Sequence, residues 1–345
     1  MPTRLKNILI CMFVLTITVV FGYYFYQNRY KHFPIDLVYA WVDDSDETWL
    51  QKKHYWQEKY GINEIYSVGN TRFRDREELL HSLRSVDLYM PWIRNIYIVT
   101  DNQVPKWLNL NHPKIKIVDH KEIFPADALP VFNSIAIESR IALIPGLSEH
   151  FIYSNDDCFI NKPLTPDFFF NENKEPVYYF DSVNNEKSLQ DVRTEKNNIR
   201  LRLAVNPARV FRKKIDIDFS KVQSVAGIHN MLGIRKSQLL KIMETFENEL
   251  KSTNYSKFRS ENDVMINSLY YFWRFKHQQI DLRDSRKNMD KYGCKNAGIL
   301  VLNNMEDLNT GDPCMFCLND SITVDPALHT NYLRKRFPKK SQFEK

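Results

Sequence analysis

The strongest chemical signal in this 345-residue sequence is a pair of adjacent aspartates, Asp156 and Asp157, directly after an apolar run at residues 151–154. Such a run predicts a strand buried in a parallel sheet, and open α/β sheets bind ligands beyond the carboxyl ends of their strands. Two carboxylates there are suited to hold Mg²⁺ or Mn²⁺ against phosphate oxygens. A polar turn with solvated aspartates would give the same sequence, so this segment alone leaves both interpretations open.

Three further runs of the same kind occur along the chain, and an acid follows each of them. They are residues 35–42, 96–100 and 115–118, followed by Asp43, Asp101 and Asp119. Because the carboxyl ends of parallel strands share one edge of a sheet, these acids indicate a single polar crevice. The pattern predicts an α/β fold, Rossmann-like or glycosyltransferase-A-like, with a mostly parallel sheet and helices on both faces.

Helical patterns separate these runs. Asp75-x-x-Glu78 has the form of a capping box, and Leu79 and Leu83 begin an apolar stripe that ends before Pro91. Residues 133–144 predict a second helix, and Ser260-x-x-Asp263 predicts the start of a third. Residues 171–200 are polar and predict an insertion or loop.

Charged residues within these elements extend the crevice. Asp36 lies inside an apolar run, so it must be paired or ligand-bound, and a structural salt bridge is the alternative to a functional role. Arg72 and Arg74 precede a predicted helix, and Arg259 precedes another, where arginines and outward N–H groups make an anion site. His229, in an apolar stretch, is either a hydrogen-bonded core residue or a catalyst.

Composition narrows the class of protein. No G-x-x-x-x-G-K or G-x-G-x-x-G pattern occurs, which excludes a P-loop and a glycine-fingerprint dinucleotide site. The net charge of +6 comes from basic ends, with +4 over residues 1–32 and +5 over residues 334–345, so the body carries −3. An acidic body argues against nucleic acid as a partner. The basic ends suit an anionic membrane surface or are solvated tails.

The N-terminal segment predicts a membrane anchor. From Ile8 to Tyr26 the chain has 19 residues without a charge, which as a helix would span about 28 Å, close to the bilayer core. No small-residue cleavage site follows, so an uncleaved single-pass anchor is favoured over a signal peptide. We therefore divide the chain into an anchor at residues 1–32 and one catalytic domain at residues 33–345.

The chain has five cysteines, and two of them, Cys314 and Cys317, form a C-x-x-C pattern. Zinc would need two more ligands, and the sequence offers Cys294 as one obvious further ligand. Ordinary thiols or one disulfide explain these residues equally well. Cysteine usage does not determine the redox compartment.

These segments together resemble the Stealth family of hexose-1-phosphate transferases, and its four regions can be matched in order. The first resembles residues 35–46, and the second resembles residues 72–75, 82–85, 89–94, 96–103 and 107–109. The third resembles residues 132–138, 144–149 and 151–157, and the fourth resembles residues 317–320 and 337–343. The sequence departs from the family at Asp44, where glycine is common, and at Arg76 and Met90, where Asn and Ala are usual.

The resemblance implies transfer of a sugar-1-phosphate from a nucleotide diphosphate-sugar to a saccharide hydroxyl, with release of the nucleoside monophosphate. We expect a UDP-sugar as the donor. By motif it assigns catalysis to Asp36, Asp156, His229, Arg259 and Asp320. We expect substrate contacts from Trp41, Asp43, Asp46, Arg72, Arg74, Asp75, Arg84 and Asn133. We expect Mg²⁺ or Mn²⁺ at Asp156, Asp157 and Asp320, and a general base at His229.

Two other functions compete with this one. A metal-dependent glycosyltransferase would use Asn155-Asp-Asp157 as a D-x-D motif and release UDP. A catalytically inactive carbohydrate-binding protein would need aromatic platforms more than phosphate-clamping groups. The expected product is a phosphodiester-linked capsular or exopolysaccharide, made on the cytoplasmic side of the membrane in a bacterium or in the Golgi lumen in a eukaryote.

Overall fold

The structure is a computed structural model, and it describes residues 17–18, 33–180, 199–219, 222, 231–301, 304–319 and 325–345. Its strands are β1 (Ile35–Ala40), β2 (Ile96–Thr100), β3 (Ile115–Asp119), β4 (His150–Asn155), β5 (Cys158–Ile160), β6 (Val177–Phe180), β7 (Leu232–Arg235), β8 (Asp281–Asp284), β9 (Asn296–Val301) and β10 (Pro313–Leu318). Its α-helices are α2 (Glu47–Tyr60), α3 (Ile65–Val68), α4 (Glu78–Tyr89), α5 (Ser134–Glu138), α6 (Ile199–Lys214), α7 (Lys236–Thr245), α8 (Glu247–Tyr255), α9 (Ile266–Lys276), α10 (Glu306–Gly311) and α11 (Pro326–Arg336).

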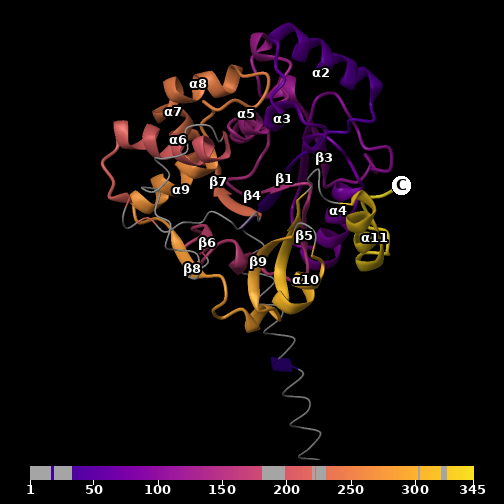
Figure 1. The fold of residues 1–345 in the computed structure, drawn as a ribbon. Helices are drawn as coiled ribbons and strands as arrows, with labels where there is room; N and C mark the ends of the chain where they lie inside the picture. Colours follow the sequence, from indigo (N-terminus) through magenta and orange to yellow (C-terminus); the bar gives the residue numbers. More distant parts are fainter. Residues whose placement is uncertain are drawn as a thin grey trace, which may run out of the picture.

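The central sheet has five strands in the order β3-β2-β1-β4-β7. The first four are parallel, and β7 is antiparallel to β4 (Figure 1). All four strands predicted from apolar runs are confirmed as β1 to β4. Tyr39 of β1 is in register with Ile98 of β2 and with Ser154 of β4, so the carboxyl ends of these strands lie together.

Helices cover both faces of this sheet, as the sequence predicts (Figure 1). Along β1, Leu37 and Tyr39 contribute to one core cluster with Leu79 and Leu83 of α4. Val38 contributes to a second cluster on the opposite face, which includes residues of α5 to α9. This alternation along a strand that is buried on both faces is typical of a sheet between two helical layers.

Two smaller sheets complete the fold. One has the order β5-β10-β9, with β10 antiparallel to β5 and parallel to β9, and the other pairs β6 with β8 in parallel. Through β10 the C-terminal part of the chain reaches the end of β4, because the Leu318 N–H donates to the Asp157 carbonyl at 3.0 Å. β6 shows that part of the predicted insertion at residues 171–200 is a strand; residues 181–198 lie outside the described residues.

Helix starts differ from the sequence predictions. The Asp75–Glu78 capping box is wrong: α4 begins one residue after Glu77, whose φ is +67°, and Asp75 Oδ1 accepts from the Glu77 N–H at 3.1 Å. The helix predicted at residues 133–144 ends at Glu138 and is followed by a separate 3₁₀ turn. Asp263 accepts from the Ser260 N–H at 2.8 Å within a turn, and α9 begins only at Ile266.

The predicted anchor from Ile8 to Tyr26 lies outside the described residues except for Ile17 and Thr18. Within the part of the chain that the structure describes, none of the helices has both the length and the apolar composition that a membrane span requires.

Candidate active site

A cavity of about 660 Å³ opens at the carboxyl ends of the parallel strands. Its lining includes Trp41 after β1, Asp101 after β2, and Asp156 and Asp157 after β4. Aromatic side chains from other elements supply much of the remaining wall, among them Tyr66, Phe132, Tyr153, Phe168, Tyr178 and Tyr271. This volume lies within the range of about 300–1,000 Å³ that is usual for small-molecule sites.

Three arginines form one wall of the cavity. Arg72, Arg74 and Arg259 all line it. The Arg72 guanidinium carbon is 3.9 Å from the ring centroid of Tyr66, and that of Arg259 is 5.1 Å from the same ring. Arg259 Nη2 also donates to Ser134 Oγ at 2.5 Å. Stacking on Tyr66 positions guanidinium groups that can bind phosphate oxygens in a bidentate manner.

Carboxyl groups form a second part of the cavity lining. Asp156, Asp157 and Glu78 line the cavity, with Asp75 close behind them. Burial, followed by repulsion from Asp157, Glu78 and Asp75, raises the pKa of Asp156 well above its ordinary range. Burial raises the pKa of Glu78 to about 8, and burial with the charge of Asp43 raises that of Asp75 to about 6.

A bound cation would relieve this repulsion. Oxygen ligands and excess negative charge fit the hard cations Mg²⁺ and Mn²⁺, so Asp156 and Asp157 meet the chemical requirement for the predicted site. Asp320, the third predicted metal ligand, and His229, the predicted base, both lie outside the described residues.

Glu138 is a cavity residue that the sequence analysis did not select. It lies at the last position of α5, and its Oε2 accepts from Asn267 Nδ2 at 2.9 Å. Burial raises the pKa of Glu138 to about 7, although the nearby Arg259 charge opposes this rise. The sequence signal that could have identified Glu138 was its place in the same segment as Asn133. Its contact with Asn267, however, comes from α9.

Asp36 lies at the opposite end of β1 and does not line the cavity. It is fully buried, and its carboxylate accepts from Arg94 Nε at 2.8 Å and Nη2 at 2.6 Å. The N–H groups of Asn95, at 3.2 Å, and Ser148, at 2.8 Å, complete its contacts. Asp36 is therefore held in a structural ion pair away from the cavity lining, and its catalytic role stays a prediction.

Arg84, Asn133 and Asp46, predicted to contact the substrate, make structural contacts. Arg84 binds Glu344 through Nε at 2.9 Å and Nη2 at 2.7 Å, which attaches the C-terminal segment to α4. Asn133 caps α5 and donates to Asp263 at 2.8 Å. Asp46 caps α2. None of the three is among the residues that line the cavity.

Asp43 and Asp75 lie behind the lining. Asp43 Oδ1 accepts from the Ser45 N–H at 2.9 Å, and the charge of Asp43 acts on Asp75. Of the predicted substrate-binding residues, the structure thus brings Trp41, Arg72 and Arg74 into the cavity wall. The predicted catalytic residues Asp156 and Arg259 also line the cavity.

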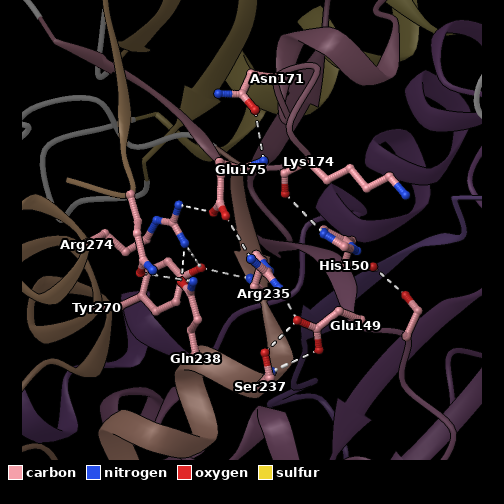
Figure 2. Close-up of polar contacts among 12 residues, drawn as sticks. Glu149, His150, Asn171, Lys174, Glu175, Arg235, Ser237, Gln238, Tyr270 and Arg274 are labelled. Carbon is pink, nitrogen blue, oxygen red and sulfur yellow. Dashed lines mark hydrogen bonds and ion pairs between the residues drawn. The ribbon is translucent and has the colours of Figure 1, made fainter. Parts of the chain in front are cut away.

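An ionic network supports the wall that β6 provides (Figure 2). Glu175, just before β6, accepts from Arg235 Nη1 at 2.8 Å and from the fully buried Arg274 at 2.5 Å. Arg235 also binds Glu149 at 3.1 Å. The network ties the turn before β6 to β7 and α9, and Val177, Tyr178 and Tyr179 of β6 line the cavity.

Three arginines and the acids at the strand ends line one cavity of an α/β fold, and this lining is chemically suited to phosphate-containing ligands. Comparison with known proteins makes this specific. Residues 33–61 match the family described as Stealth protein CR1, conserved region 1, and residues 72–178 match Stealth protein CR2, conserved region 2. The chain belongs to the Stealth family.

The relatives are polysaccharide phosphotransferases. The chain is 34% identical over 344 residues to exopolysaccharide phosphotransferase cps2G of Lactiplantibacillus plantarum, covering 91% of this chain and 97% of the relative. It is 39% identical over 237 residues to capsular polysaccharide phosphotransferase fcs1 of Haemophilus influenzae, covering 69% of this chain and 64% of the relative. It is 34% identical to exopolysaccharide phosphotransferase SCO2594 of Streptomyces coelicolor, covering 91% of this chain but 52% of the relative.

Among solved structures, galactosyltransferase LgtC in complex with donor and acceptor sugar analogues matches with a TM-score of 0.43 and 11% identity, covering 89% of this chain and 96% of that one. This similarity is too distant to support an assignment. The family membership therefore rests on the sequence relatives.

Proposed function

We propose that this chain transfers a hexose-1-phosphate, such as an N-acetylhexosamine-1-phosphate, from a nucleotide diphosphate-sugar to a saccharide hydroxyl. The product would be a phosphodiester link in a capsular or exopolysaccharide, and the leaving group would be the nucleoside monophosphate. One observation carries the proposal beyond family membership: Arg72, Arg74 and Arg259 line the same cavity as Asp156 and Asp157. Such a site suits a diphosphate held between cationic groups and a cation.

In the proposed reaction the acceptor oxygen attacks the β-phosphorus of the donor. A bond forms from the acceptor oxygen to that phosphorus, and the bond from it to the bridging oxygen breaks, so the nucleoside monophosphate leaves. Arg72, Arg74 and Arg259 would offset negative charge on the phosphoryl oxygens. His229 is the proposed base that takes the hydroxyl proton.

We further propose that Asp156 and Asp157, with Asp320, hold Mg²⁺ or Mn²⁺. The cation would neutralise charge on the donor diphosphate. The raised pKa of Asp156 supports this proposal, because the carboxylates that repel it would gain a counter-charge. Glu138, beside Arg259 on the cavity wall, would contribute a group that changes protonation near neutral pH.

A glycosyltransferase is the second candidate, because Asp156 and Asp157 follow a strand as the metal-binding acids of a D-x-D motif would. It would use the same donor and cation but break the bond at the anomeric carbon and release UDP. Attachment to a membrane through the segment from Ile8 to Tyr26 and a cytoplasmic catalytic domain, if the host is bacterial, stay predictions.

The released nucleotide distinguishes the two reactions. The full chain in detergent would be incubated with Mg²⁺, a panel of UDP-sugars and a polysaccharide acceptor, and nucleotides would be separated by chromatography. Acceptor-dependent UMP is the expected product. UDP would replace the proposal with the glycosyltransferase, and Asp307→Asn, at an exposed residue of α10, serves as the control for substitutions of Asp156.

A further inference from the structure

Two thiols and a carboxylate converge beside the cavity. Cys158 of β5 and Cys317 of β10 are directly opposite each other in the antiparallel pair. Their sulfur atoms and a carboxylate oxygen of Asp157 all lie within 4.8 Å of one another. The Cys158 thiol is 3.7 Å from Asp157 Oδ1. Strand register, rather than a mobile loop, therefore positions both thiols.

Neither Cys158 nor Cys317 forms a disulfide. In the described part of the chain, the disulfide present joins Cys294 and Cys314 instead. Cys158 is 2% exposed and Cys317 is 0% exposed, whereas Asp157 is half-buried and lines the cavity. The two sulfur atoms are thus buried, whereas the Asp157 carboxylate lies at the cavity.

We propose that Cys158, Cys317 and Asp157 form a binding site for one thiophilic divalent cation of the Zn²⁺ class. Thiolate sulfur selects such cations over Mg²⁺, which prefers oxygen ligands. In a tetrahedral site with Zn–S bonds of about 2.3 Å, the two sulfurs would be about 3.8 Å apart. The separations of at most 4.8 Å require only small side-chain adjustments to reach that geometry.

The fourth coordination position would face the cavity, since Asp157 is the ligand that lines it. Three protein ligands with one open position are the pattern of zinc sites that accept a water or substrate oxygen, rather than of closed structural sites. Binding converts both thiols to thiolates, so each cation that binds releases two protons from them. The cation also takes up Asp157, which the proposed Mg²⁺ or Mn²⁺ site uses, so the two cations compete.

The proposal goes beyond the proposed function and does not depend on it, because metal binding is measured without turnover. The test uses Cd²⁺ as the probe and follows the ultraviolet charge-transfer absorption of thiolate–Cd²⁺ bonds on the full chain. All proteins carry Cys11→Ser, so that the remaining cysteines are the four in the catalytic part. Zn²⁺ would then be titrated against bound Cd²⁺.

We expect one Cd²⁺ per chain, which Zn²⁺ displaces. Mg²⁺ should lower the apparent Cd²⁺ affinity only through its competition for Asp157, and the thiolate band should persist at saturating Cd²⁺. Cys158→Ser and Cys317→Ser should each lower the affinity at least about tenfold, since even outer-shell changes at metal sites cost this much. Asp157→Asn should weaken binding while the charge-transfer band remains. Calorimetry in buffers of different ionisation enthalpy should show release of about two protons.

The matched control is Cys294→Ala with Cys314→Ala, which removes two cysteines that the proposal does not use. It should keep the Cd²⁺ band. A band that is lost in this control and survives in the Cys158→Ser/Cys317→Ser variant would overturn the proposal, as would no band in the unmodified site. Thermal unfolding of each variant confirms that loss of the band does not reflect loss of the fold.

Discussion

At the amino ends of the parallel strands a buried aspartate is fully paired, whereas at the carboxyl ends the acids face one another. Asp36 accepts four hydrogen bonds, from Arg94, Asn95 and Ser148. Asp156 lies among Asp157, Glu78 and Asp75, which raise its pKa. The same residue type therefore stabilises the fold through an ion pair at one end of the sheet, and lies among crowded carboxyl groups that a cation could bind at the other.

Removing the paired aspartate should have the largest effect on stability. Asp36→Asn places an amide N–H₂ among donors and weakens the contacts to Arg94 and Ser148. We expect it to lower the free energy of unfolding by about 3 kcal/mol, as for loss of buried charge-assisted hydrogen bonds. Urea denaturation measures this. Turnover per folded molecule should stay close to that of the wild type, and a selective loss of turnover would restore Asp36 to the catalytic site.

The same substitution at the other end of the sheet should have the opposite result. Asp156→Asn should lower turnover at least about 100-fold, if the carboxylate holds a catalytic cation. Its stability should be equal to or above that of the wild type, because the change removes a repelled carboxylate. Steady-state kinetics and urea denaturation test both statements. Wild-type turnover would refute the metal role, and a large loss of stability would remove the contrast with Asp36.

The pH dependence of stability tests Glu138, another buried carboxyl group of the cavity. Its pKa is raised from 4.5 to about 7, so the folded protein keeps a proton that the unfolded chain loses. The stabilising effect is present below about pH 4.5 and is lost as the pH rises to about 7. Glu138→Gln should therefore gain stability relative to the wild type across that interval, on the order of 2 kcal/mol. Parallel stability–pH curves for the two proteins would contradict the shift.

The sheet could be predicted from the sequence because strands buried on both faces are continuous apolar runs, a local signal. Helix starts were less predictable. Asp75 and Ser260 have the residue types of helix caps. Asp75 instead accepts from the Glu77 N–H, and Ser260 lies in a turn in which its N–H donates to Asp263. Short polar side chains satisfy backbone groups in turns as readily as at helix ends, so the pattern alone does not distinguish the two.

The candidate site was predictable only where topology determines it. Asp156 and Asp157 line the cavity because parallel strands end on one edge. The sequence left a salt bridge open for Asp36 but could not identify its partner, because Arg94 is 58 residues away. Glu138 was missed for the converse reason, since the Asn267 contact that positions it comes from 129 residues away.

Arg84 extends the comparison to an ion pair that links distant segments. Arg84 is 14% exposed and its partner Glu344 is 4% exposed, whereas the similar pair of Arg334 and Glu77 is 59% and 41% exposed. Arg84→Ala should cost about 1.5 kcal/mol, and Arg334→Ala should cost less, because solvent screens the exposed pair.

Both variants should keep the wild-type KM for the donor, because neither arginine is among the cavity-lining residues. Urea denaturation and donor titration of the two variants separate the outcomes. A raised KM in Arg84→Ala with unchanged stability would return Arg84 to the substrate site. Equal stability losses in both variants would show that burial does not set the strength of these pairs. The distinction between the paired Asp36 and the crowded carboxyl groups around Asp156 would then have to rest on geometry alone.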